Sequence, residues 1–407
     1  MAVVKDKRNG GVGLPIKQRQ LQLFGGMGLL TGLGAGLATY AILREPMNVC
    51  LERLTIRLPN AKGRLPTNGL RILHLSDTHF QGIDWREQTK IDRIRALTAG
   101  LEYDLLIHTG DFWHNEVGLN NIVALLESVP RPRLGGYGVL GNHDYVCYSH
   151  SDMLTRNWQR YQAHQQHVGQ NGQNGQNGQN NHKDHPVQGS ALPVMNQEQN
   201  GAVMPTGQRS GHYDNGARPS RLTAFYENAR EVYRFAQYFM NMPFDLKRVH
   251  FNDVAQLRQA LTHSEIQVLH NHSLRLRAKP GQSDGVDIYL AGVDDVTEGT
   301  PDLQRALHNI DPNEPTLLLS HNPDILLESR SRQADLILAG HTHGGQIVLP
   351  LVGAAHTHSE HLRRHEAAGY LQRGPTQVYV SRGIGEGIPL RFGARPQIAL
   401  ITVIAAD

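Results

Sequence analysis

Two features are scarce in this 407-residue sequence: cysteine and net charge. The two cysteines, Cys50 and Cys147, could form one disulfide, but they exclude a disulfide framework and a zinc site built from thiolates. The 40 Lys and Arg residues against 37 Asp and Glu residues give a formal net charge of +3. That excess is too small to indicate a nucleic-acid partner, which normally requires a concentrated basic surface. Histidine, by contrast, is abundant at 23 residues, and its distribution determines the interpretation.

The N-terminal region has the pattern of a membrane anchor. Residues 1–20 form a basic, polar tail, and residues 21–43 contain no charged side chain. At about 1.5 Å per residue, a helix of this length reaches the roughly 30 Å hydrocarbon thickness of a bilayer. We therefore expect a transmembrane anchor at 21–43, with a cleaved signal as the alternative because Thr39-Tyr40-Ala41 is a weak cleavage site. The predicted location is the inner cell membrane with a single pass. Basic residues on both flanks leave only a slight preference for an extracytoplasmic catalytic domain.

From residue 71 onward, short apolar runs of strand length alternate with stretches of helical periodicity. The clearest strand-like runs are 71–75, 104–108, 137–140, 316–320 and 335–339, and helix-like stretches lie at 86–101 and 120–129. This alternation predicts an α/β domain with largely buried strands. We assign the domain to 70–145 and 250–405, preceded by a linker and first strand region at 44–69.

Residues 146–249 interrupt this pattern and are expected to be an insertion. Residues 160–220 are rich in Gln, Asn, Gly and His, a composition that cannot bury enough apolar surface, so we expect disorder there. Residues 221–242 carry aromatic side chains at helical spacing. This predicts a helix whose apolar stripe is a packing face, with a cap that touches the membrane or a lipid-like substrate as the alternative.

Potential metal ligands directly follow five of the apolar runs. They are Asp77 and His79, then Asp111, then Asn142 with the neighbouring His143, then His321, and finally His341 and His343. Because loops at the carboxyl ends of strands converge at one edge of an α/β sheet, we expect these side chains to share one pocket. So many polar groups are costly to bury unless they are paired or coordinate metal.

The ligand types narrow the choice of metal. Oxygen and imidazole donors without a thiolate suit two divalent ions drawn from Mn²⁺, Fe, Zn²⁺ or Co²⁺. We expect Asp111 to bridge two ions about 3.5–4 Å apart, the spacing of two-metal hydrolases. Asp77, His79 and His343 would complete one site, and Asn142, His321 and His341 the other.

His143 is predicted to have a separate, catalytic role. If the chain there is extended, its side chain points away from that of Asn142, since neighbouring side chains alternate along a strand. An imidazole beside the metals is well placed to donate a proton to the leaving oxygen.

The ordered set of motifs resembles the signature of the calcineurin-like metallophosphoesterase superfamily. The motifs are Asp-x-His, Gly-Asp, Gly-Asn-His-Asp, a lone His and Gly-His-x-His, over 70–145 and 250–405. The runs 340–346 and 379–385, with Arg391 and Pro396, are similar to the membrane-associated bacterial branch that includes UDP-2,3-diacylglucosamine hydrolases. The resemblance implies a four-layer α/β/β/α sandwich and agrees with the ligand roles above. Relatives often carry a twin-arginine export signal, whereas residues 17–21 contain one arginine.

Together these observations predict a dinuclear metal-dependent phosphoesterase that cleaves a phosphodiester or pyrophosphate bond by attack of metal-bound hydroxide. The favoured substrate class is lipid-linked, of the UDP-2,3-diacylglucosamine type. One alternative is a nuclease-like phosphodiesterase, which would need a basic groove. Another is a non-catalytic metal-binding scaffold at the membrane, which would be expected to lack ligands. The oligomeric state stays open.

Overall fold

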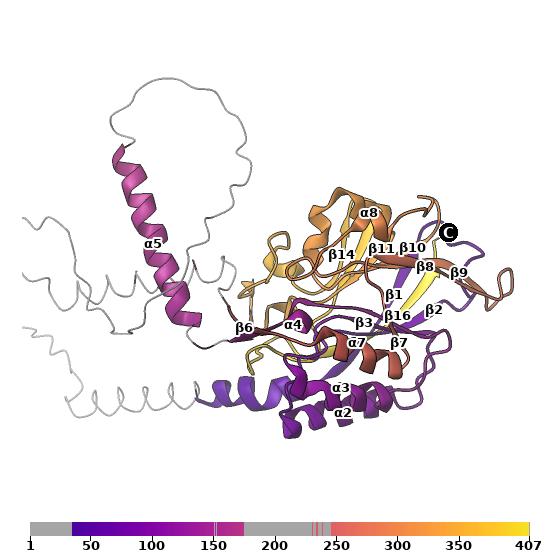
Figure 1. The fold of residues 1–407 in the computed structure, drawn as a ribbon, viewed down its shortest axis with the longest axis horizontal. Helices are drawn as coiled ribbons and strands as arrows, with labels where there is room; N and C mark the ends of the chain where they lie inside the picture. Colours follow the sequence, from indigo (N-terminus) through magenta and orange to yellow (C-terminus); the bar gives the residue numbers. More distant parts are fainter. Residues whose placement is uncertain are drawn as a thin grey trace, which may run out of the picture. The chain divides into compact units, whose positions relative to one another are not determined.

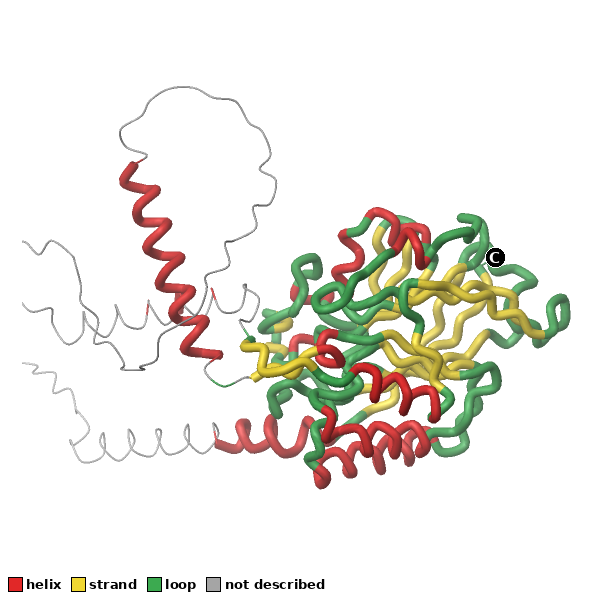
Figure 2. Tube along the Cα trace, viewed as in Figure 1, coloured by secondary structure: helices red, strands yellow, loops and turns green. Residues whose placement is uncertain are grey.

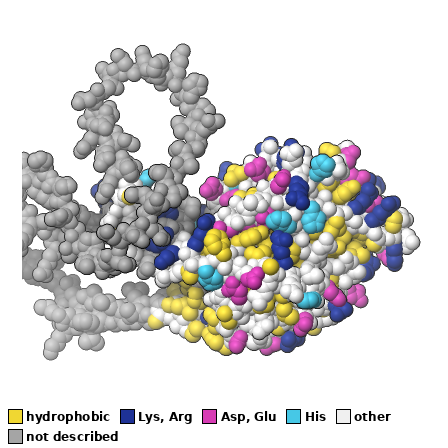
Figure 3. Space-filling view, in the orientation of Figure 1, with side chains coloured by type: hydrophobic (Ala, Val, Ile, Leu, Met, Phe, Trp, Pro, Cys, Tyr) yellow, Lys and Arg dark blue, Asp and Glu magenta, His cyan; other side chains and the backbone are white. Residues whose placement is uncertain are grey.

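The computed structural model describes residues 35–149, 151, 153–174, 230, 233–234, 238 and 246–406. By its internal contacts the chain divides into two compact units, Met1–Met153 with Pro243–Asp407, and Leu154–Met242. All the predicted site residues belong to the first unit. Acidic and basic side chains are interspersed on the face of this unit that Figure 3 shows.

The first sheet of this unit has the strand order β1-β16-β2-β3-β4-β7. Its strands β2, β3, β4 and β7 are parallel, whereas β16 runs parallel to β1 and antiparallel to β2. The last strand of the chain therefore lies between the first two (Figure 1). The strand bounds are β1 (Cys50–Leu58), β2 (Leu70–Leu75), β3 (Leu105–Thr109), β4 (Gly136–Val139), β7 (Ile266–Val268) and β16 (Gln397–Ala405).

The second sheet has the order β14-β15-β11-β10-β9-β8, with a parallel centre and antiparallel edge strands β8 and β14. Its strands are β8 (His272–Ala278), β9 (Val286–Gly292), β10 (Thr316–Leu319), β11 (Leu336–Ala339), β14 (Gly369–Arg373) and β15 (Thr376–Val380). Two small antiparallel pairs are β12 (Val348–Leu349) with β13 (Gly353–Ala354), and β5 (Val146–Ser149) with β6 (Lys247–Phe251).

Three hydrophobic clusters show how the layers stack. One cluster joins inward-facing residues of both sheets, such as Ile107 and Leu317. A second packs the other face of the first sheet against α2 (Asp84–Thr98), α3 (Leu119–Ser128) and α7 (Val254–His263). A third packs the outer face of the second sheet against α8 (Leu303–Ala306), η5 (Pro323–Leu327) and Ala334, which follows η6 (Ser329–Gln333). The layers are therefore stacked in the order helix, sheet, sheet, helix (Figure 2). This arrangement confirms the predicted α/β class.

The five predicted strands correspond to β2, β3, β4, β10 and β11, and the two predicted helices to α2 and α3. Of the predicted anchor, residues 21–34 lie outside the described residues. Residues 35–39 are helical and continue into the π-helix η1 (Tyr40–Arg44) and the 3₁₀ helix η2 (Glu45–Met47). Across the described ranges, no helix is both long enough and apolar enough to cross a bilayer.

The prediction of disorder from residue 160 onward is wrong for residues 160–174, which belong to α5 (Met153–Asn174). The first half of this helix carries aromatic contacts, since the rings of Trp158 and Tyr161 lie 5.5 Å apart and Tyr161 is buried. The rest of the low-complexity stretch, 175–220, lies outside the described residues. Of the predicted helix at 221–242, only 230, 233, 234 and 238 are described, and all four are helical.

Candidate metal centre and active site

The predicted ligands sit in loops that begin where five strands of the two sheets end, namely β2, β3 and β4 of the first sheet and β10 and β11 of the second. Several of these non-glycine residues have a positive φ, a backbone conformation that residues with a side chain rarely adopt. They are Asp77 (50°), His79 (47°), Asp111 (55°), His341 (69°) and His343 (51°). Such strained positions persist only where the surrounding structure holds them, and they cluster at functional sites.

Two glycines allow these loops to approach one another closely. A Cβ atom on Gly340 would lie 2.0 Å from Ser76 Oγ and 2.3 Å from Asp77 Oδ2. A Cβ atom on Gly141 would lie 2.3 Å from Asp111 Oδ1. The glycine that precedes the ligands in each of these motifs is therefore required by contact between loops.

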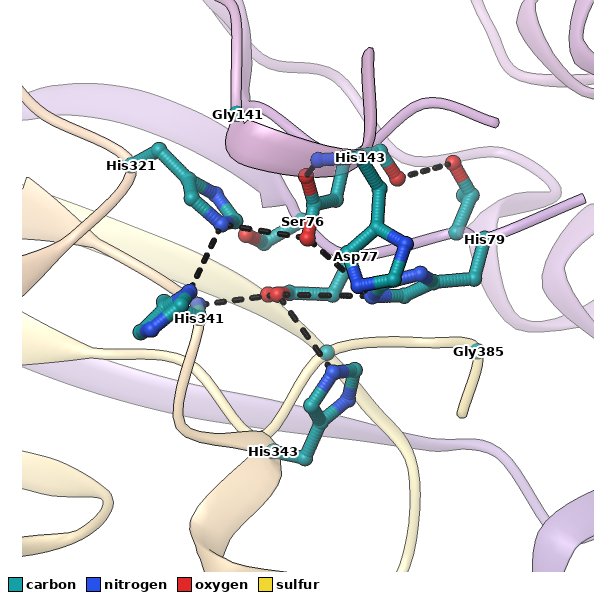
Figure 4. Close-up of polar contacts among 12 residues, drawn as sticks. Ser76, Asp77, His79, Gly141, His143, His321, His341, His343 and Gly385 are labelled. Carbon is teal, nitrogen blue, oxygen red and sulfur yellow. Dashed lines mark hydrogen bonds and ion pairs between the residues drawn. The ribbon is translucent and has the colours of Figure 1, made fainter. Parts of the chain in front are cut away.

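The first group of predicted ligands consists of Asp77, His79 and His343, whose nearest donor atoms all lie within 4.8 Å of one another. The Nε2 atoms of His79 and His343 lie 4.0 and 3.9 Å from Asp77 Oδ1, and the two rings are 4.7 Å apart. All three side chains are almost completely buried. Figure 4 shows them pointing toward a common centre.

The second group consists of Asp111, His321 and His341, again with donor atoms within 4.8 Å. His321 Nε2 lies 3.1 Å from Asp111 Oδ2 and 3.1 Å from His341 Nδ1. Asn142 lies at the start of the short helix α4 (Asn142–Tyr145), and its Oδ1 is buried and accepts no hydrogen bond within the described structure.

Asp111 connects the two groups. Its Oδ2 atom lies 3.2 Å from His79 Nε2 in the first group and 3.1 Å from His321 Nε2 in the second. Its Oδ1 atom accepts a hydrogen bond of 2.8 Å from the backbone N–H of His143. One carboxylate oxygen thus faces both sets of imidazoles while the other is held by the β4 loop.

Burial and neighbouring charges shift the pKa values of several side chains in the site. Burial raises the pKa of Asp77 to about 6, and the largest opposing effect is the charge of His321. Burial lowers the pKa of His321, but the nearby carboxylates, above all Asp111, outweigh it and raise the pKa to about 10. Burial and His321 together lower the pKa of His341 to about 4. His321 is thus held cationic beside a neutral His341, in a pocket that also buries Asp77, Asp111, Asp144 and Asp295.

These residues fit a pair of divalent cations. The donors are carboxylate oxygen, amide oxygen and imidazole nitrogen without thiolate, a set that suits borderline divalent metals. The pocket buries four carboxyl groups, and their ionised forms are costly to bury without cations. The buried Asn142 Oδ1 without a hydrogen-bond donor is a further atom that a metal would satisfy.

His143 lies beside the first group, with its ring 4.5 Å from that of His79. The extended chain considered for Asn142 and His143 is wrong, because both belong to α4, where the Asp144 side chain closes a single helical turn. The His143 Nδ1 atom lies 2.9 Å from Nδ1 of His114, whose Nε2 lies 2.9 Å from the carbonyl oxygen of Tyr148. Since that carbonyl can only accept, His114 carries its proton on Nε2, and its Nδ1 can accept from His143. His79, His114 and His143 form a third set with nitrogens within 4.8 Å.

Asp144 is a structural residue of the site to which the sequence assigned no role. Its Oδ2 accepts from the backbone N–H groups of Asp111 (2.9 Å) and Gly141 (2.8 Å), and its Oδ1 from Phe112 (2.8 Å) and Trp113 (3.3 Å). Burial raises the pKa of Asp144, and these donors oppose the shift by favouring the ionised form. Its place in the Gly-Asn-His-Asp motif was the signal that could have identified it.

A second supporting cluster surrounds Arg391, which is fully buried. Its guanidinium donates to the carbonyl oxygens of His343 (3.3 Å), Ala394 (3.0 Å) and Gly385. Glu386 lies 3.9 Å from Arg391 and forms buried ion pairs with Arg86 (2.8 Å) and Lys90 (2.6 Å). These contacts fix the loop that carries His343, and no spacing in the sequence indicated the partners from α2.

Comparison with known proteins agrees with this geometry. Residues 70–345 match the family model described as calcineurin-like phosphoesterase. The chain is 28% identical over 369 residues to the UDP-2,3-diacylglucosamine pyrophosphatase LpxG of Chlamydia muridarum, covering 88% of this chain and 90% of that protein. It is 38% identical over 122 residues to the uncharacterized metallophosphoesterase YkuE of Bacillus subtilis, covering 30% of this chain and 42% of the relative. A bovine transmembrane protein with a metallophosphoesterase domain is 39% identical over 168 residues, covering 38% of this chain and 36% of that protein.

A two-sheet fold with clustered aspartates and histidines at its strand ends defines a metal-dependent phosphoric ester hydrolase. The match over most of the domain shows that the chain belongs to the calcineurin-like phosphoesterase family, whose members use two divalent metals. The resemblance to the bacterial UDP-2,3-diacylglucosamine hydrolases is confirmed, since two such pyrophosphatases align with 88% of the chain.

Proposed function

We propose that this enzyme hydrolyses the pyrophosphate bond of a lipid-linked nucleotide sugar of the UDP-2,3-diacylglucosamine type. The observation that carries the proposal is the position of Asp111 Oδ2 between His79 and His321, which suits one carboxylate shared by two cations. The substrate class is supported by the similarity to the chlamydial pyrophosphatases over nearly the whole chain.

We assign the ligands to two adjacent ions that share Asp111. Asp77, His79 and His343 would hold one ion, and Asn142, His321 and His341 would hold the other. When bound, such a pair supplies a nucleophile from water at neutral pH and neutralises charge on the phosphoryl oxygens. The positive φ of Asp77, His79 and Asp111 and the hydrogen bonds of Asp144 keep the ligand side chains oriented before substrate arrives.

His143 is assigned to donate a proton to the leaving phosphate oxygen. Its Nδ1 faces His114, so its Nε2 is the atom that can serve the substrate. His114 in turn is fixed by the carbonyl of Tyr148, which orients the His143 ring. A positioned imidazole of this kind contributes about 10²–10⁴-fold to rate.

Membrane association is part of the proposal. The uncharged run at 21–43, an acylated substrate in the name of the chlamydial relative and a membrane span in the name of the bovine relative support it. In this arrangement the enzyme meets a substrate that itself resides in the bilayer.

The test uses the full chain purified in detergent with Mn²⁺. Uridine monophosphate release from UDP-2,3-diacylglucosamine is measured beside hydrolysis of bis-p-nitrophenyl phosphate and cleavage of duplex DNA. We expect turnover of the lipid-linked pyrophosphate, and a His143→Ala variant with at least about 100-fold lower kcat and unchanged metal content. His263→Ala, which removes an exposed imidazole on α7, is the matched control and should leave kcat unchanged.

Two results would contradict the proposal. Preferred cleavage of DNA over the acylated pyrophosphate would indicate a nuclease. Loss of metal in His143→Ala would show that the set formed by His79, His114 and His143 is a ligand set, and that His143 is not a proton donor.

A further inference from the structure

The described N-terminal helix has an unusual surface. Residues 35–40 are exposed on every side, and the sequence there, Ala-Gly-Leu-Ala-Thr-Tyr, contains no charge. The Thr39 hydroxyl donates to the carbonyl oxygen of Ala35 at 2.9 Å, so it needs no water. A helix that is apolar all round is normally buried in a protein core or in a bilayer.

The helix ends against the catalytic domain beside two further exposed apolar side chains. Leu37, Tyr40, Ile42 and Leu43 are 41–53% exposed. Ile83 and Trp85, at the start of α2, are 38% and 59% exposed. The Arg86 guanidinium joins the two segments, because it donates to the carbonyl oxygen of Ile42 (3.3 Å) and lies 5.4 Å from the Trp85 ring. We call these six apolar side chains the apolar face, and Figure 3 shows hydrophobic side chains gathered where the helix meets the domain.

The chemistry of the apolar face matches a membrane interface. Tryptophan and tyrosine favour the level of the lipid headgroups, where one edge of the ring is apolar and the other is hydrated. Arg44 is exposed at the end of η1, where its long side chain can reach lipid phosphate. The uncharged run that begins at residue 21 leads directly into this face.

We propose that the apolar face rests on the lipid bilayer, with Ile83 and Trp85 in the interface beside the end of the N-terminal helix. The inference rests on the membrane association proposed above and adds a second contact, made by the catalytic domain itself. That contact would fix how the domain is oriented on the membrane.

A cavity of about 300 Å³ has lining residues in both the apolar face and the metal centre. Ile83 of the apolar face and His79 of the metal centre both line it, together with Pro389. The backbone N–H of Arg391, two residues after Pro389, donates to the carbonyl oxygen of Ala41 in η1 (2.9 Å). An orientation with this face on the bilayer would therefore bring the cavity close to a lipid-borne substrate.

The first experiment asks whether Trp85 contacts lipid. The full chain is reconstituted into vesicles of phosphatidylcholine and phosphatidylglycerol, with and without phosphatidylcholine brominated on its acyl chains. Bromine quenches tryptophan emission at short range. Of the three tryptophans, Trp113 is buried in the domain, and Trp158 is replaced by phenylalanine in every protein compared. We expect quenching that is lost in Trp85→Phe. Equal quenching in the wild type and Trp85→Phe would overturn the proposal, and would leave a second copy of the chain or residues 1–34 as the occupant of the face.

The second experiment separates docking from catalysis. In Trp85→Ser, kcat/KM for UDP-2,3-diacylglucosamine in vesicles should fall about tenfold, because the indole no longer enters the interface. Hydrolysis of bis-p-nitrophenyl phosphate by the same protein should not change. Leu327→Ser is the matched control, since Leu327 is also 59% exposed but lies on η5, and it should leave both activities unchanged.

The two readouts also distinguish this inference from the proposed function. If no protein cleaves the acylated pyrophosphate, the proposed substrate is wrong, while lipid quenching of Trp85 still tests the docking. If Trp85→Ser lowers both activities equally, the side chain supports the fold and the docking proposal is refuted.

Discussion

The hydrogen bonds of Asp144 lead to a sharp prediction for the single change Asp144→Asn. The carboxylate accepts four backbone N–H groups, two on each oxygen. An asparagine can present its oxygen to only one pair. Its NH₂ group then faces the other pair, so two buried N–H donors lose their acceptor.

The cost can be worked from these contacts. Hydrogen bonds to a charged group contribute about 1.5–3 kcal/mol each, so the loss of two predicts destabilisation by about 3–6 kcal/mol. This is a large part of the roughly 5–15 kcal/mol that separates folded from unfolded proteins. Since the lost donors belong to the loops that carry Asp111 and Asn142, hydrolysis of bis-p-nitrophenyl phosphate should fall as well.

The assay is chemical denaturation of the full chain in detergent, beside turnover of the diester. Asp253→Asn is the matched control, because Asp253 caps α7 with both N–H groups on one oxygen, Oδ1, which asparagine retains. It should change stability by less than about 0.5 kcal/mol. An Asp144→Asn protein within about 1 kcal/mol of the wild type and with full activity would refute the reasoning.

Three further predictions concern other parts of the first unit. In Gly141→Ala the new Cβ would lie 2.3 Å from Asp111 Oδ1, so diester turnover should fall about 100-fold. Gly36→Ala is the control, because open space surrounds Gly36, and it should leave turnover unchanged. Equal turnover in the two variants would contradict the close approach of the loops. Glu386→Gln removes the carboxylate that pairs with buried Arg86 and Lys90, so the free energy of unfolding should fall by about 3–5 kcal/mol. A fall of less than about 1 kcal/mol would show that these cations have other partners. Burial raises the pKa of Asp335 from 3.8 to about 6, so the protonated form favours the folded state and this stabilisation is lost as pH rises through about 6. The difference in unfolding free energy between the wild type and Asp335→Asn should therefore fall between pH 4 and 7. The fall should be at most about 2 kcal/mol, because the carboxyl group is partly exposed. A difference that does not change with pH would exclude the pKa shift.

Much of the fold could be predicted from local sequence patterns. Strand-like runs such as 71–75 and 335–339 are apolar throughout because both faces of their sheets are covered, and they became β2 and β11. The order of strands was not predictable in this way. The final strand β16 lies between β1 and β2, and that pairing joins residues more than three hundred positions apart, for which no local pattern exists.

In the candidate site, too, local motifs could be predicted from the sequence, whereas tertiary contacts could not. Asp77, Asp111 and the histidine motifs could be picked out as candidates because each directly follows a strand-like run, and the structure brings them together. Their partners could not be found by spacing. Glu386 supports the His343 loop through ion pairs with α2 and Arg391, and these contacts depend on tertiary folding.

In the proposed metal centre, two cations would share the Asp111 carboxylate. The most direct measurement is metal analysis of the Mn²⁺-loaded enzyme combined with electron paramagnetic resonance of the same sample. We expect two ions per chain with the magnetic coupling of ions about 3.5–4 Å apart, and loss of that coupling in Asp111→Ala. One ion per chain, or two ions without coupling in the wild type, would contradict it.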